Sequence, residues 1–107
     1  MGGRLELDGF SEFPSILCEA WAHIGPPRPA QKNKPMVDSI KLQYVSSLFN
    51  MQGKCILLFG DREAASHYQG QSWMAQYLKK QNIVIKIIEF PPQIREKILK
   101  AQKRQRR

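Results

Sequence analysis

Two strongly apolar runs constrain the fold of this chain more than any other feature. One is "KCILLFG" at 54–60 and the other is "IVIKIIEF" at 83–90. Each has the length of a strand and is apolar at nearly every position, which is typical of a parallel sheet covered by helices on both faces. The segment 71–82 between them has helical spacing. A strand, a helix and a second strand predict parallel pairing through a crossover connection.

The N-terminal third adds a hairpin to this unit. Residues 4–8, "RLELD", alternate apolar and polar side chains, and residues 16–23 form a second apolar run after a turn at 9–15. Neighbouring strands joined by a short loop usually pair in the antiparallel sense. The expected order is β-β-α-β-α-β-α, an α/β domain with a central mixed four-stranded sheet and flanking helices.

Helices are expected on the faces of this sheet. The first begins at 30–35, because Pro35 fits only the first turn of a helix. Asp61 is expected to cap a helix at 62–68, and the last helix begins at about 92. The side chains expected to face the core are Val37, Ile40, Tyr44, Val45 and Leu48 on the first helix, Trp73, Met74, Tyr77 and Leu78 on the third, and Ile94, Ile98 and Leu99 on the last.

Positive charge is concentrated at the C-terminal end of the chain. The net charge is +8 over 107 residues, and residues 95–107 hold seven Lys and Arg against one Glu, which is +6. We expect one domain at 1–94 and a basic helical tail at 95–107. Such a tail attracts polyanions, of which DNA is the expected partner, and the alternative is a solvated helix end without a partner. The residues expected to contact nucleic acid are Lys100, Lys103, Arg104, Arg106 and Arg107.

Several classes of protein are disfavoured by what the sequence lacks. No apolar run approaches the roughly 20 residues that a membrane span requires, and the N-terminus has no signal-peptide core. Cys18 and Cys55 lie in apolar runs and are expected to be buried free thiols in a reducing cytoplasm. The glycine-rich phosphate loops, the nucleophile elbow and the HExxH zinc motif are all missing. We therefore expect a cytoplasmic protein without membrane contact.

The most informative polar residue is Glu19, which interrupts the apolar run "ILCEAWAHIG" at 16–25. Side-chain alternation places Glu19 and Trp21 on one face of this strand, and pairing of the hairpin brings Asp8 towards Glu19. Two carboxylates at this position repel each other and lose solvation. Mg²⁺ relieves both costs, and the Ala20 carbonyl is a candidate third ligand. The chemistry that follows is metal-assisted hydrolysis of a phosphodiester.

The same residues carry a resemblance to a known family. An Asp on one hairpin strand and a Glu-x-Lys position on the next, followed by helix, strand and helix, is the pattern of the PD-(D/E)xK nuclease superfamily. The chain resembles this restriction-endonuclease-like fold over roughly residues 4–90, with Asp8 in "LELDG" and Glu19 in "ILCEAW". The resemblance implies Mg²⁺-dependent cleavage of DNA, with Asp8 and Glu19 as catalytic metal ligands.

This chain departs from the family pattern in two ways. Trp21 stands where the family has the Lys that orients the attacking water and stabilises charge. In some members the cation comes from the following helix, where Lys32 and Lys34 are both candidates here. Family members also have a helix and a strand before the Asp strand, so the fold would be truncated, completed by a partner subunit, or catalytically inactive. A core that lacks one strand leaves an exposed edge, which favours a homodimer.

Other interpretations of these residues remain open. Asp8 also fits a turn, and Glu19 also fits a solvent-facing position or an ion pair with Arg28 or a helix lysine. Two other functions compete with a nuclease. One is a non-enzymatic nucleic-acid-binding or interaction module that uses the basic tail. The other is a flavodoxin-like domain that binds a phosphorylated ligand near Gly60 and Asp61.

Overall fold

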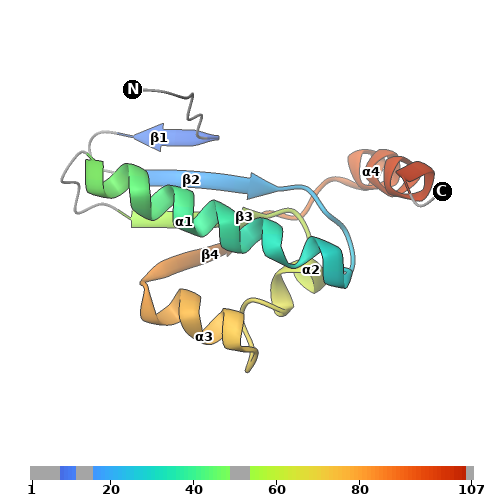
Figure 1. Ribbon diagram of the computed structural model, residues 1–107. Helices are drawn as coiled ribbons and strands as arrows, with labels where there is room; N and C mark the ends of the chain where they lie inside the picture. Colours follow the sequence, from blue (N-terminus) through green and yellow to red (C-terminus); the bar gives the residue numbers. More distant parts are fainter. Residues whose placement is uncertain (1–7, 12–15, 49–53, 106–107) are drawn as a thin grey trace.

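The computed structural model describes residues 8–11, 16–48 and 54–105, and for Phe10 and Ser11 only the backbone. Strands and helices alternate along the chain after the first two strands (Figure 1). The elements are β1 (Gly9–Ser11), β2 (Ile16–Trp21), the single 3₁₀ turn η1 (Pro29–Gln31), α1 (Asn33–Leu48), β3 (Lys54–Phe59), α2 (Arg62–Ser66), α3 (Trp73–Lys80), β4 (Ile83–Ile87) and α4 (Pro92–Gln105).

Three parallel strands form the body of the sheet. β2 pairs with β3 and β3 pairs with β4, both in the parallel sense. β1 adds only three residues, antiparallel to β2 at its outer edge. The predicted α/β class and the parallel pairing of 54–60 with 83–90 are therefore confirmed, but the expected mixed sheet of four full strands does not form.

The antiparallel strand lies later in the chain than predicted. The strand expected at 4–8 lies outside the described residues except for Asp8, which forms an exposed bend. Residues 9–11, expected to be a turn, form β1 instead. Gly9 is opposite Cys18, and a Cβ added to Gly9 would lie 3.3 Å from the Cβ of Cys18. Glycine at this position therefore lets the two backbones approach closely, so it belongs to the strand.

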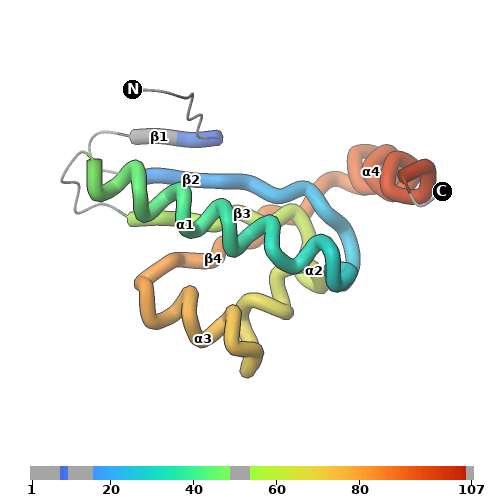
Figure 2. Tube along the Cα trace, in the orientation of Figure 1, coloured from blue at the N-terminus to red at the C-terminus, as the bar shows by residue number. Residues whose placement is uncertain are grey.

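Helices α1, α2 and α3 enclose a single core on one face of the sheet (Figure 2). Along β3 the burial alternates, with Ile56 and Leu58 only half-buried on the opposite face. The expectation that 54–60 is covered on both faces is therefore wrong for the described part of the chain. The buried core residues are Leu17, Met36, Leu42, Val45, Cys55, Leu57, Phe59, Ala64, Ala65, Tyr68, Met74, Leu78 and Ile83.

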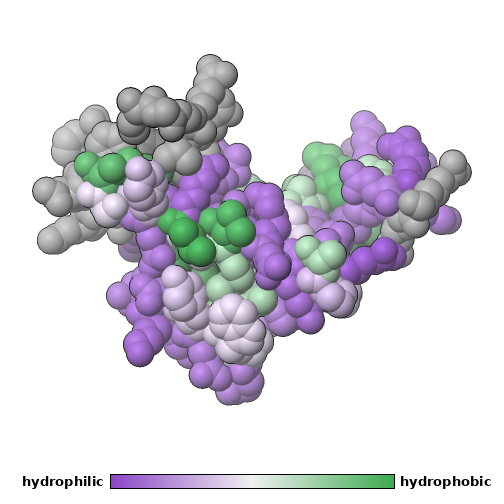
Figure 3. Space-filling model, in the orientation of Figure 1, coloured by the Kyte–Doolittle hydropathy of each residue, from purple (hydrophilic) through white to green (hydrophobic). Residues whose placement is uncertain are grey.

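α1 presents a different face to the sheet from the one predicted. Of the five apolar residues expected to face the core, Val45 is buried and the other four are 48–59% exposed: Val37, Ile40, Tyr44 and Leu48. Figure 3 shows hydrophobic atoms gathered over α1 on the surface turned to the viewer. The buried side instead includes Leu42 and the polar residues Asp38 and Ser39. The face turned towards β2 therefore carries polar groups into the interior.

The remaining helix predictions are confirmed in part. Pro35 lies in the first turn of α1, and Asp61 caps α2 by accepting a hydrogen bond from the Ala64 N–H at 3.1 Å. Met74 and Leu78 of α3 are buried as expected. Trp73 on α3 and Ile94 and Leu99 on α4 are exposed, because α3 contacts the sheet along one narrow side and α4 lies beyond the end of the sheet (Figure 1).

Two further sequence expectations have a structural outcome. Cys55 is buried and Cys18 is half-buried, and both are free thiols. Among the described residues, no helix combines the length and the apolar character that crossing a membrane would require.

Candidate active site

Glu19 lies on β2 beneath α1, and its side chain is 4% exposed. Strand alternation turns Leu17, Glu19 and Trp21 to the face that α1 covers, as the sequence predicted. The Lys41 side chain extends from α1 towards this carboxylate, and its Nζ lies 2.6 Å from Glu19 Oε1. This contact raises the pKa of the Lys41 ammonium, so the lysine stays positively charged beside the buried acid.

Asp8 contacts the same carboxyl group from the outer edge of β2. Its Oδ2 accepts a hydrogen bond from the Ala20 N–H at 2.7 Å, and its carboxyl group lies close enough to that of Glu19 for each to shift the pKa of the other. The Ala20 N–H lowers the pKa of Asp8. Burial raises the pKa of Glu19, and the neighbouring Asp8 raises it further, against the opposing effect of Lys41. The two acids are therefore a coupled pair in which Glu19 is the one that retains a proton more readily.

The backbone carbonyl of Ala20 points towards the same edge. The Trp21 carbonyl accepts a hydrogen bond from the Gly60 N–H at 3.2 Å, so it faces β3. Because the peptide groups of successive residues point to opposite sides of a strand, the Ala20 carbonyl faces away from β3, where its own N–H meets Asp8. The Ala20 carbonyl and the Asp8 carboxylate therefore lie on the outer side of β2, while Glu19 lies on the face beneath α1.

These donors fit one kind of metal ion better than others. They are all oxygen atoms, which Mg²⁺ prefers, and Mg²⁺ commonly binds through one or two carboxylates while keeping several water ligands. Among residues 8–11, 16–48 and 54–105, no group of three or more His, Cys, Asp and Glu side chains is placed to hold a metal. The set lacks the nitrogen and sulfur ligands that zinc favours.

The two lysines expected to assist occupy different places. Lys34 Nζ lies 2.8 Å from both carboxylate oxygens of Asp38, and the charge of Lys34 helps to lower the pKa of Asp8 after the stronger effects already described. Lys32 lies elsewhere, because its carbonyl accepts a hydrogen bond from the Tyr68 hydroxyl at 2.9 Å. Lys34 therefore pairs with Asp38 and acts on Asp8 through its charge alone, and among the described residues neither Lys34 nor Lys32 contacts Asp8 or Glu19.

The sequence left open an ion pair between Glu19 and a helix lysine, and the structure shows that this lysine is Lys41, which the sequence did not single out. Lys41 follows the buried Asp38 by three residues and precedes the buried Val45 by four, which is the spacing of one helix face. The helical spacing of Lys41 from Asp38 and Val45 therefore indicates that Lys41 lies on the same side of α1 as these buried residues. The side of α1 that includes Val37 and Ile40 is more hydrophobic, so the sequence pattern predicts that this side is buried, whereas the structure exposes it.

The predicted nucleic-acid contacts lie partly on α4. Lys100, Lys103 and Arg104 are exposed along this helix, and Arg106 and Arg107 lie outside the described residues. Lys100 is 3.4 Å from Glu96 in an exposed i,i+4 pair. Exposed pairs of this kind contribute little to stability, so these cations are available to bind a polyanion.

A shallow hollow adjoins Asp8, and Glu19 is not among the residues that line it. It has a volume of about 310 Å³, and Asp8, Trp21, Gly60 and Phe90 are among the residues that line it. A Cβ added to Gly60 would lie 2.0 Å from Phe90 Cε2. Glycine at the end of β3 therefore lets the Phe90 ring close over the backbone and shape one side of the hollow.

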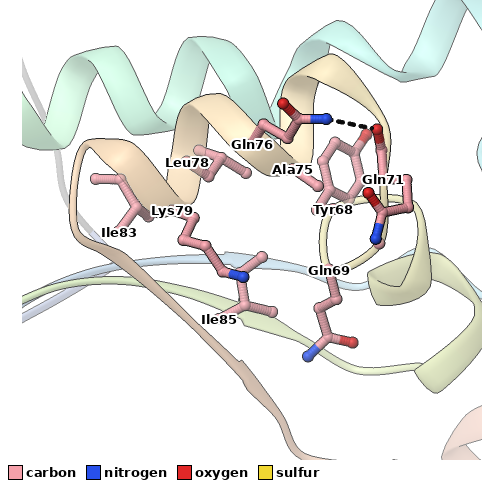
Figure 4. Close-up of a pocket in the computed structure, with 10 residues that line it drawn as sticks. Tyr68, Gln69, Gln71, Ala75, Gln76, Leu78, Lys79, Ile83 and Ile85 are labelled. Atoms are coloured by element: carbon pink, nitrogen blue, oxygen red, sulfur yellow. Dashed lines mark hydrogen bonds between the residues drawn. The ribbon is translucent and has the colours of Figure 1, made fainter.

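A second hollow lies between α3 and β4, away from the carboxylates (Figure 4). Its volume is about 350 Å³, and its polar lining includes Gln69, Gln71 and Gln76. Gln76 donates a hydrogen bond to the Gln71 carbonyl at 3.0 Å. Lys79 is the one side chain with a full charge among the residues that line it. It therefore offers no acid or base pair comparable to Asp8 and Glu19.

The start of α2 is occupied by the protein itself. Asp61 Oδ2 accepts hydrogen bonds from the Gly25 N–H at 2.8 Å and from the Ala64 N–H at 3.1 Å. A phosphate at this helix start would have to displace a carboxylate from its donors. The position near Gly60 and Asp61 therefore does not favour a phosphorylated ligand.

No protein-family model matches the chain, and neither the curated proteins nor the solved structures contain a significant match. The geometry of the cluster formed by Asp8, Glu19 and Lys41, called here the carboxylate centre, is therefore the basis for assigning a function.

Proposed function

We propose that the protein is a Mg²⁺-dependent nuclease that hydrolyses phosphodiester bonds in DNA at the carboxylate centre. One observation carries this proposal. The buried Glu19 lies 2.6 Å from the Lys41 ammonium, and the neighbouring Asp8 carboxyl group raises the pKa of Glu19. Two acids and a cation that lie close together shift one another's pKa values, and such perturbed pKa values are typical of functional sites.

Each residue has a distinct role in the proposed reaction. Asp8, Glu19 and the Ala20 carbonyl would hold the metal, which supplies charge neutralisation and a water of lowered pKa when bound. Lys41 places a permanent positive charge next to Glu19, where it can hold the carboxylate in position and stabilise charge that develops on the phosphate. Lys34, which is 55% exposed, can contact an adjacent phosphate.

This arrangement also accounts for the unusual residue in the resemblance to the PD-(D/E)xK superfamily. Trp21 occupies the sequence position of the family lysine, but its ring packs against the core. Lys41 comes from the helix that follows the hairpin, as in those members whose cation has moved to that helix. We therefore assign the role to Lys41 in place of Lys32 or Lys34, within a restriction-endonuclease-like fold.

The test uses labelled single-stranded and duplex DNA incubated with the protein and Mg²⁺. The proposal expects cleavage by the wild-type protein and a loss of at least about 100-fold in the Glu19→Gln variant. Glu89→Gln is the matched control, because the Glu89 side chain is 58% exposed and pairs with Arg62 at 3.2 Å, away from the carboxylate centre. Cleavage by Glu19→Gln at the wild-type rate, with circular dichroism showing both variants folded, would contradict the proposal.

A second candidate function rests on α4. Lys97, Lys103 and Arg104 are exposed on this helix, which favours a non-enzymatic module that binds nucleic acid through charge alone. That function predicts DNA binding that weakens steeply with salt and does not depend on Glu19. Deletion of residues 100–107 would abolish binding in this case, while metal-dependent cleavage would be absent from the intact protein.

A further inference from the structure

A groove separates α4 from the C-terminal end of β2. Its volume is about 510 Å³, and its lining includes Trp21, His23, Gln31, Ile98 and Gln105. α4 stands apart from the sheet in Figure 1, and the recess beside it is visible in Figure 3. None of Asp8, Glu19 and Lys41 lines the groove, although Lys34 does.

Two anchors hold the groove open. Gln102 on α4 accepts a hydrogen bond from the Ile24 N–H at 2.8 Å and donates one to the Ile24 carbonyl at 3.0 Å. At the start of the helix, Arg95 Nη1 donates to Asp61 Oδ1 at 2.6 Å. α4 has no buried residue, so these polar contacts, more than a hydrophobic interface, position it. A groove that is fixed in advance reduces the ordering cost of binding.

One wall of the groove is aromatic. The Trp21 and His23 rings stack at a centroid distance of 4.8 Å with an interplanar angle of 12°. Phe59 and Tyr68 meet the Trp21 ring edge-on at 6.0 and 6.5 Å, which fixes its orientation. Rigid aromatic rings beside aliphatic side chains such as Ile98 form a surface suited to a flat heterocycle.

The rim of the groove supplies hydrogen-bonding groups and positive charge. Gln31 uses its Oε1 to accept from the Arg28 N–H at 2.9 Å, which leaves its amide N–H groups for a ligand. Within the described part of the chain, no hydrogen bond engages the Gln105 side chain. Lys34 lines one end of the groove. A ligand with an aromatic ring, a hydrogen-bonding edge and an anionic group matches these three features, and a nucleotide has all of them.

The groove adjoins the hollow that Asp8 of the carboxylate centre lines. Trp21 and Ala22 line both the groove and the hollow that contains Asp8. A nucleotide whose phosphate lies at Asp8 can therefore extend its base past Trp21 into the groove. A base inside a continuous duplex is stacked and paired, so it cannot make these contacts.

We infer that the groove binds an unstacked nucleobase next to the phosphate at the carboxylate centre, so the substrate is single-stranded DNA or a single-stranded segment. This inference rests on the proposed function, because it places the scissile phosphate at Asp8. It adds the substrate class, which the carboxylates do not specify.

The test measures binding in EDTA, where no metal-dependent cleavage occurs. The chain has two tryptophans, so the Trp73→Phe variant reports Trp21 fluorescence alone. A short oligothymidylate is expected to quench this fluorescence and to bind at least about tenfold more tightly than a blunt duplex of the same length. Trp21→Leu is expected to weaken oligothymidylate binding by about tenfold, measured by anisotropy of a labelled strand.

Variants at the rim of the groove keep the test decisive if Trp21→Leu does not fold. Gln105→Ala changes an exposed side chain and is expected to weaken oligothymidylate binding severalfold, whereas Gln76→Ala in the second hollow leaves it unchanged. Equal affinity for the duplex, or absence of Trp21 quenching together with a neutral Gln105→Ala, would overturn the inference. Binding with quenching but without cleavage in Mg²⁺ would support the groove and reject the nuclease, so the two failures are distinguishable.

Discussion

Two buried carboxylates, Glu19 and Asp61, have similar exposure and opposite surroundings. They are 4% and 3% exposed, and each lies 2.6 Å from one cationic side chain, Lys41 or Arg95. Asp61 also accepts hydrogen bonds from two backbone N–H groups. Glu19 has a second carboxyl group, that of Asp8, where Asp61 has backbone donors.

This difference in partners reverses the direction of the pKa shift. Burial by itself raises the pKa of Asp61, but the hydrogen bonds from Arg95, Gly25 and Ala64 together lower it below its ordinary value. Burial raises the pKa of Glu19, and Asp8 adds to the increase. A fully satisfied carboxylate stabilises the fold at neutral pH, whereas an unsatisfied one gains from a bound cation. We therefore interpret the Asp61 centre as structural and the Glu19 centre as functional.

The largest expected effect concerns the cation at the functional centre. Lys41→Met is expected to lower the rate of DNA cleavage by about 10²–10³-fold, because a positive charge beside the reacting phosphate is lost. Lys54→Met, which changes an exposed lysine on β3, serves as the control. A Lys41→Met rate within a few-fold of wild type would remove Lys41 from the mechanism.

The next effect separates the two centres by stability. Asp61→Ala is expected to lower the free energy of unfolding by about 2–4 kcal/mol, since it removes a helix cap and leaves the Gly25 N–H without its acceptor. Glu19→Gln is expected to change the free energy by less than about 1 kcal/mol, because it replaces a costly buried charge with a neutral group. Urea unfolding of both variants measures the difference. A larger loss for Glu19→Gln would reverse the assignment of the two centres.

Magnesium is expected to stabilise only the functional centre. At a concentration tenfold above its Kd, Mg²⁺ would stabilise the wild-type protein by about 1.4 kcal/mol. The shift in Tm should increase from pH 5 to pH 7, because the ion competes with the proton that the raised pKa of Glu19 retains. Differential scanning fluorimetry of wild type, Glu19→Gln and Asp61→Asn tests this. Loss of the shift in Asp61→Asn but not in Glu19→Gln would contradict the comparison.

The smallest effect is the pH dependence of stability. The lowered pKa of Asp61 provides stability above its unfolded value of about 4, which is lost as the pH falls through the folded pKa. The raised pKa of Glu19 acts in the opposite direction, so stability falls as the pH rises from about 4 through its folded pKa. Asp61→Asn should flatten the acid limb of the profile, and Glu19→Gln should flatten the limb above it. Denaturant midpoints measured across pH 3–7 report both slopes.

Sequence periodicity predicted the strands better than it predicted the faces of the helices. The runs at 54–60 and 83–90 contain the strands β3 and β4, although β4 ends at Ile87, because short apolar segments with β-branched residues have few alternatives. α1 was harder, since Val37 and Ile40 form a better apolar stripe than the side that is buried. The inner face carries Asp38, which pairs with Lys34, and Lys41, which contacts Glu19. Local pattern and fold disagree at this position, as is common at functional sites.

The sequence by itself determined the α/β class, the parallel pairing of β3 with β4, and the side-chain alternation that puts Glu19 on the same face of β2 as Leu17 and Trp21. These features follow from patterns that are local or that repeat along one segment, so they can be inferred without knowledge of the tertiary contacts. The tertiary structure decided which lysine joins Glu19, because Lys41 reaches it only once α1 lies across β2. It also decided that the apolar stripe of α1 faces outwards, since burial depends on the neighbour that a helix meets in space.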